Sequence, residues 1–106
     1  MITRLFTYKH HNGLRAAVVA LSCESEAAAN TEEFANVGAC LAMSVAATHA
    51  SATDPIVAEW YANDRAAGWS IGTALNGLES ALHERVVLKS ATRFAIAGDA
   101  CVTVVW

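Results

Sequence analysis

The stretch that decides the fold begins with Tyr8-Lys-His-His-Asn-Gly-Leu-Arg-Ala-Ala-Val-Val-Ala-Leu21. An Asn-Gly pair between two largely apolar segments is the strongest short-range signal for a β-hairpin. If Asn12-Gly13 forms the loop, the register places Phe6 opposite Val19. The segment therefore predicts two antiparallel strands that are joined by a tight turn.

Both faces of this predicted hairpin are largely apolar. One face carries Phe6, Tyr8, Ala17, Val19 and Leu21, and the other carries Leu5, Thr7, Leu14, Ala16, Val18 and Ala20. An antiparallel sheet with one face in water normally alternates apolar and polar residues. We therefore expect helices to cover one face, and a partner protein or a second copy of the chain to cover the other. The residues predicted for the dimer or partner face are Phe6, Tyr8, Val19 and Leu21.

Helical patterns occupy the middle of the chain. Asn30, with Glu33 three residues later, fits a capping box, and the helix that follows repeats apolar side chains at helical spacing. Its apolar stripe consists of Phe34, Val37, Leu41 and Val45. A second helix is predicted from Pro55 to Gly68 and a third from about Ser70 to Glu84.

The end of the chain returns to a strand pattern. Residues 85–88 are expected to be extended, Gly98-Asp99 marks a turn, and 100–106 reads as a final strand. Two early strands, a helical middle and one late strand predict an α+β fold. We expect a single domain over residues 1–106, with a three-stranded antiparallel sheet and three helices packed on one face.

Composition narrows the possible partners. The 106 residues are 55% hydrophobic and only 16% charged, with a net charge of −3. Such a chain has no basic patch for nucleic acid or an anionic membrane surface, and no apolar run reaches the length of a spanning helix. Three cysteines without a C-x-x-C pair indicate reduced, buried thiols, and with no signal pattern at the N-terminus we expect a cytoplasmic protein.

No constellation of catalytic or metal-binding residues is visible in the sequence. The four histidines are His10, His11, His49 and His83. None of them has ligand spacing to a cysteine or carboxylate, and there is no glycine-rich phosphate loop. The sequence therefore predicts no enzyme activity, no metal and no cofactor, and it favours a protein that acts through its surface.

The segment from Tyr8 to Ala47 resembles the core domain of elongation factor Ts, the nucleotide-exchange partner of the translational GTPase EF-Tu. The resemblance needs no gap over about 40 residues and is looser beyond them. Full-length members also carry an N-terminal three-helix domain, which has no counterpart here, so the resemblance implies a divergent, single-core form. It implies the fold described above and EF-Tu as the partner.

The resemblance places the partner contact in the loop after the second strand. Cys23-Glu-Ser-Glu-Ala-Ala-Ala-Asn30 aligns with the family pattern C-E-T-D-F-V-A-R. In the family, the Phe of this loop wedges into the GTPase and lowers its affinity for GDP. Here Ala27 replaces that Phe, which implies weakened or altered exchange. The implied partner-binding residues are Ser25, Glu26, Ala27, Ala28 and Asn30.

Two interpretations remain open at this point. The chain is either an elongation factor Ts-like protein that binds EF-Tu, or an interaction module of the same fold without exchange activity. In the second case, residues 24–30 serve only to connect a strand to a helix. The module would then bind another protein or form a homodimer through its sheet, as the doubly apolar strands suggest.

Overall fold

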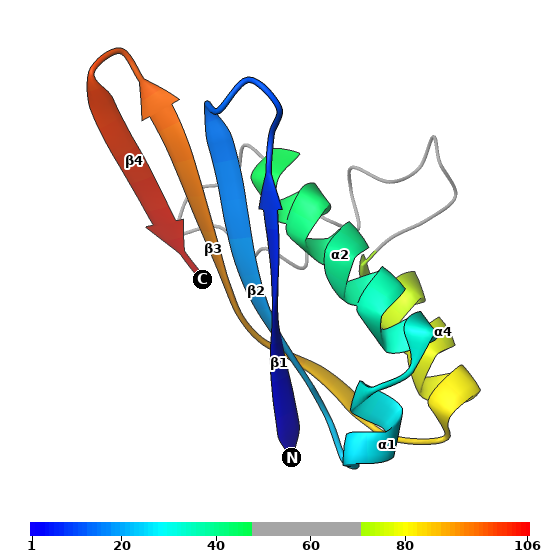
Figure 1. Ribbon diagram of the computed structural model, residues 1–106. Coiled ribbons are helices and arrows are strands. Elements are labelled where there is room, and N and C mark those ends of the chain that lie inside the picture. The colour runs from blue at the N-terminus through cyan, green and yellow to red at the C-terminus, as the bar shows by residue number, and fades with distance from the viewer. Residues whose placement is uncertain (48–70) are drawn as a thin grey trace.

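The computed structural model describes residues 1–47 and 71–106 (Figure 1). The elements in chain order are β1 (Ile2–Lys9), β2 (Arg15–Cys23), α1 (Glu26–Ala29), α2 (Glu32–Ala47), α4 (Ile71–Leu82), β3 (Val86–Ala97) and β4 (Ala100–Val105). The strands form one antiparallel sheet in the order β1-β2-β3-β4. The predicted α+β class is confirmed, whereas the helix predicted from Pro55 to Gly68 lies outside the described residues.

The hairpin has the predicted register but a wider loop. Phe6 pairs with Val19, as expected. The backbone N–H of His10 donates to the carbonyl of Arg15 at 2.8 Å, and the N–H of Gly13 donates to the carbonyl of His10 at 2.9 Å. The loop therefore spans residues 11–14 instead of two residues. Gly13 has a φ of 73°, which few other residues adopt at low cost. Because the loop gains one residue on each side of Asn12-Gly13, the register of the two strands is unchanged.

The sheet has four strands, so the prediction of three was wrong. The strand that was missed is β3, which pairs with β2 over residues 86–95 and with β4 over residues 92–97. Ala20 pairs with Ser90, but Leu21 pairs with Leu88, so Lys89 is an extra residue in β3. Such a bulge shifts which residues point to each face. The apolar alternation of 86–97 is broken there, and the segment does not read as a strand.

The hydrophobic core lies between the sheet and α2. Figure 1 shows the described helices on one side of the sheet, and α2 contacts β1, β2 and β3. Phe34, Leu41 and Val45 of α2 are fully buried, as are Val19 and Leu21 of β2. The ring centroids of Phe6 and Phe34 lie 5.7 Å apart. The predicted apolar stripe of α2 is confirmed, with Val37 at its partly buried margin.

This packing corrects the choice of partner face. Val19 and Leu21 have no exposed surface, and Phe6 and Tyr8 pack against the same core. They therefore lie under the helices of their own chain, where a partner has no access without unfolding. The sheet face that is open to a partner is the opposite one.

The helix ends differ from the predicted ones in two places. Thr31, and not Asn30, caps α2, because its hydroxyl oxygen accepts a hydrogen bond from the N–H of Phe34 at 3.2 Å. Asn30 instead ends α1, and its N–H donates to the carbonyl of Glu26 at 3.1 Å. At the far end of α4, His83 has a φ of 55° and stops the helix before Glu84. Glu84 therefore lies after the end of α4 and is not part of the helix.

None of the helices within 1–47 and 71–106 combines the length and the hydrophobicity that crossing a bilayer requires.

Gly38 provides a test of the packing between α2 and β1. A Cβ atom at this position would overlap the ring of Phe6. We expect Gly38→Ala to destabilise the protein by about 1–3 kcal/mol, because overpacking outweighs the gain of about 1 kcal/mol in helix propensity. Chemical denaturation measures the change, with Gly77→Ala as the matched control, because nothing lies near a Cβ at Gly77. A stabilised Gly38→Ala protein would contradict this packing.

Candidate partner-binding elbow

The elbow, residues 24–30, connects β2 to α2 through the single turn α1. It lies beside the N-terminal end of β1 (Figure 1). Ser25 caps α1, because its hydroxyl oxygen accepts a hydrogen bond from the N–H of Ala28 at 3.2 Å. The carbonyl of Ala28 in turn accepts the hydroxyl of Thr31 at 2.7 Å. The two hydroxyl side chains thus fix both ends of the elbow.

A carboxylate from the other half of the chain holds the elbow in place. One oxygen of Glu84 accepts the backbone N–H groups of Glu24 at 3.1 Å and Ser25 at 2.9 Å. Its second oxygen accepts the hydroxyl of Ser25. In return, the side chain of Glu24 accepts the N–H of Arg85 at 3.3 Å. Hydrogen bonds to an ionised acceptor are stronger than neutral ones, so this arrangement, the Glu84 clamp, joins the elbow to the end of α4.

The clamp favours the charged form of Glu84. The hydrogen bond from the Ser25 hydroxyl lowers the pKa of the Glu84 carboxyl group, whereas desolvation raises it. The backbone N–H groups of Ser25 and Glu24 lower this pKa further. A group whose pKa is lower in the folded protein stabilises the fold above its unfolded pKa. That contribution is lost as the pH falls through the folded pKa, so the clamp weakens in acid.

The elbow exposes some of the predicted binding residues and buries others. Glu26, Ala27 and Asn30 are exposed, and Ser25 is partly buried. Ala28 is only 6% exposed and belongs to the core, so this residue is not available to a partner. The predicted binding residues that the elbow presents are therefore Glu26, Ala27 and Asn30, and Glu24, which was not predicted, is exposed beside them.

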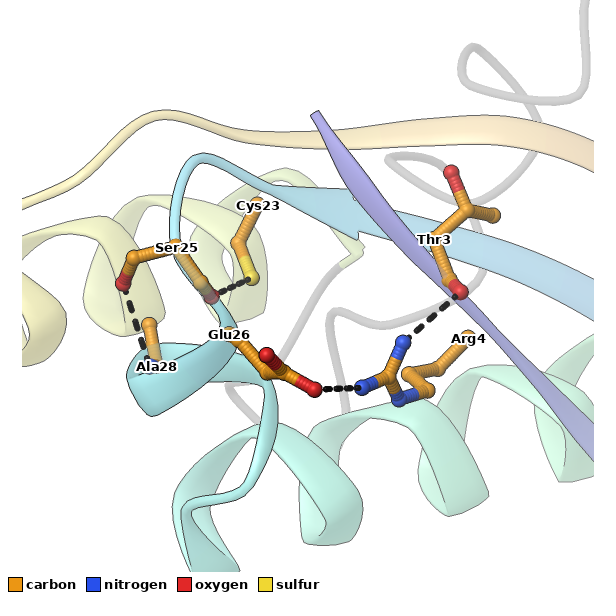
Figure 2. A network of polar contacts seen from close by, with 6 residues as sticks. All are labelled: Thr3, Arg4, Cys23, Ser25, Glu26 and Ala28. Atoms are coloured by element: carbon orange, nitrogen blue, oxygen red, sulfur yellow. Dashed lines mark hydrogen bonds and ion pairs between the residues drawn. The ribbon is translucent and has the colours of Figure 1, made fainter.

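Glu26 is partly oriented by a neighbouring strand. The guanidinium of Arg4 lies 3.8 Å from a carboxylate oxygen of Glu26 and donates to the carbonyl of Thr3 at 3.3 Å (Figure 2). The Glu26 side chain is 75% exposed, and solvent-exposed ion pairs contribute little to stability. Glu26 therefore stays on the surface as a negative charge that a partner can reach.

Cys23, which directly precedes the elbow, is buried in surroundings that disfavour its thiolate form. Burial raises the pKa of its thiol, and the negative charge of Glu84 adds to this effect. The thiol donates to the carbonyl of Ser25 at 3.3 Å, as Figure 2 shows. Cys23 is buried as predicted, but Cys40 and Cys101 are exposed, which corrects the expectation that all three are core residues.

We predict that Glu84→Gln weakens the fold at neutral pH and makes its stability less sensitive to acid. The amide keeps the shape of the side chain but lacks the charge that the two N–H groups and the Ser25 hydroxyl stabilise. Urea denaturation between neutral and acidic pH measures this, and the deficit of the variant should shrink as the pH falls. Asp99→Asn, in the loop between β3 and β4, is the matched control. Equal pH slopes for wild type and Glu84→Gln would contradict the clamp.

The second surface candidate is the open face, the side of the sheet that faces away from the described helices. Register places Leu5, Phe94, Ile96 and Val105 on this side, at 68%, 37%, 43% and 59% exposure. A shallow hollow of about 120 Å³ lies between the hairpin end and β3. Exposed apolar side chains that cluster on one face are typical of an interaction surface.

A further hollow of about 680 Å³ lies where the hairpin meets the end of α2. The hydroxyl of Tyr8 lies 3.0 Å from Nδ1 of His10 in its wall. The guanidinium of Arg15 donates to the carbonyl of Ala46 at 3.2 Å and so stabilises the end of α2. The part of the chain that the structure describes contains no cluster of metal-ligating side chains.

Sequence reasoning missed Glu84 and the β3 residues of the open face. Glu84 lies 59 positions from Ser25, and no local pattern indicates a contact over that distance. Phe94 and Ile96 would have been found had β3 been recognised, because they alternate with Arg93 and Ala95 beyond the bulge. The chain matches no known family model, and no curated protein matches it either.

Proposed function

We propose that the protein acts through protein–protein contact as an elongation factor Ts-like binder of EF-Tu, with weakened exchange of guanine nucleotides. The observation that supports this is the elbow, which follows the second strand of the hairpin, as the partner loop does in the family that the sequence resembles. It is held by the Glu84 clamp and exposes Glu26, Ala27 and Asn30. An ordered, exposed loop loses little entropy on binding.

Weakened exchange follows from the small size of Ala27. In nucleotide exchange, binding of the partner weakens binding of the nucleotide by the same free energy. A partner that distorts the nucleotide site must therefore offset the cost of that distortion through its own contacts with the GTPase. An alanine methyl group supplies much less apolar surface than a phenyl ring. We therefore propose binding without strong acceleration of GDP release.

Titration of EF-Tu·GDP with the protein tests this proposal. Calorimetry or sedimentation measures complex formation, and a fluorescent GDP analogue measures nucleotide release. We expect a one-to-one complex and a release rate that rises only slightly. Absence of a complex at concentrations up to about 100 µM, where even weak partners associate, would reject EF-Tu as the partner.

The second candidate is an interaction module that uses the open face or the sheet edge beside it. Leu5, Ile96 and Val105 are each more than 40% exposed, although they belong to a domain with a buried core. These side chains lie on the opposite side of the sheet from α2. The second candidate therefore leaves the elbow without a role in binding.

A further inference from the structure

We infer that two copies of the chain associate through β4 and form a continuous eight-stranded sheet around a twofold axis at Thr103. This inference specifies the self-association in the second candidate and does not depend on EF-Tu. Within residues 1–47 and 71–106, β4 is an outer strand that pairs on one side with β3. Its other side is a row of backbone groups that can extend the sheet.

The composition of the two sheet edges shows which one is suited to pairing. Outer strands usually carry charged residues that discourage association with other strands. β1, the opposite edge, contains Arg4 and Lys9. β4 reads Ala-Cys-Val-Thr-Val-Val and carries no charge or proline, and five of its six residues are exposed. β4 thus lacks the protection that β1 has.

The hydrogen-bond pattern defines the register of the proposed pairing. The N–H of Trp106 donates to the carbonyl of Ala91 at 2.9 Å. Along an antiparallel pair of strands, every second residue directs its backbone N–H and C=O groups toward the neighbouring strand. The backbone groups of Val104 and Val102 therefore also point toward β3. The N–H and carbonyl groups of Cys101, Thr103 and Val105 therefore point outward. Antiparallel pairing of two copies at Thr103 matches these groups with one another.

The side chains are self-complementary in this register. Thr103 faces Thr103 of the second copy, and Cys101 faces Val105. On the opposite side of the sheet, Val102 faces Val104. Threonine pairs and apolar β-branched pairs stabilise neighbouring strands, whereas like charges destabilise them, and this pairing brings no like charges together. The open faces of the two copies also join into one surface.

Sedimentation equilibrium of the 106-residue protein, without EF-Tu, tests the inference. We expect a monomer–dimer equilibrium between about 1 and 300 µM. Thr103→Lys removes the threonine pair and places two like charges opposite each other, so it should raise the dimer dissociation constant by roughly two- to tenfold. Thr7→Lys, at an exposed position on β1, is the matched control and should leave it unchanged. A monomer at all concentrations, or a dimer that Thr103→Lys does not weaken, would overturn the inference. Circular dichroism and thermal unfolding verify that both variants are folded.

Cysteine crosslinking tests the register independently. Facing residues in a hydrogen-bonded pair have Cα atoms about 5.5 Å apart, within the range of a disulfide. In a background with Cys40→Ser and Cys101→Ser, we expect Thr103→Cys to form a covalent dimer under mild oxidation. Val102→Cys, whose partner in the second copy is Val104, should crosslink much more slowly. Equal rates for the two variants would contradict the twofold axis at Thr103. Because EF-Tu is absent from these measurements, their outcome does not depend on whether EF-Tu binds.

Discussion

Ala27→Phe should raise the rate at which the protein releases GDP from EF-Tu by roughly 10- to 100-fold. Ala27 is exposed in the first turn after the Ser25 cap, so a phenyl ring at this position extends into solvent and not into the core. Burying a Phe in a packed site is worth about 3–5 kcal/mol, or roughly two to four powers of ten in an equilibrium constant. We expect part of that free energy to lower the affinity of EF-Tu for GDP.

Fluorescent-GDP release, measured at several concentrations of the variant, gives the size of this effect. Ala39→Phe is the matched control, because Ala39 is also exposed but lies on α2, beyond the elbow. It adds the same apolar surface without changing residues 24–30, and we expect it to leave the release rate unchanged. If Ala27→Phe and Ala39→Phe have the same effect, the elbow does not face the nucleotide domain.

Phe34→Ala should lower the free energy of unfolding by about 3–5 kcal/mol, enough to unfold a large share of molecules of a small domain. Phe34 has no exposed surface, contacts the ring of Phe6 and lies at the start of α2. Its removal leaves a cavity where β1, β2 and α2 meet. Urea denaturation followed by circular dichroism measures the loss.

Met43→Ala is the control for Phe34→Ala. Met43 also belongs to α2 but is 48% exposed, so its truncation removes little buried surface. We expect a change within about 0.5 kcal/mol, as for most surface substitutions. If both variants lose similar stability, the core does not lie between α2 and the sheet.

Local signals explain the parts of the fold that the sequence predicted. The Asn12-Gly13 pair determined the hairpin register, even though the loop is two residues longer than expected. The spacing of Phe34, Leu41 and Val45 identified the buried side of α2. In both cases, the determining residues are close in sequence, so their pattern is visible without knowledge of the tertiary structure.

The parts that could not be predicted depend on distant residues. Both faces of β2 are apolar, so the sequence of β2 does not show which face the helices cover. Tertiary packing decides this, for example because Gly38 of α2 leaves room for the ring of Phe6. The bulge at Lys89 interrupts the alternation of apolar and polar residues along β3, so the sequence pattern does not identify this strand. Partner binding by the elbow stays a prediction of the resemblance, and the Glu84 clamp that holds the elbow follows from no local pattern in the sequence.

The Glu84 clamp also has a consequence during protein synthesis. Ser25 emerges from the ribosome 59 residues before Glu84, and translation adds about 5–20 residues per second. For roughly 3–12 s, the nascent chain has its hairpin but lacks the carboxylate that orders residues 24 and 25. Residues 24 and 25 therefore reach their final arrangement only after Glu84 has also left the ribosome.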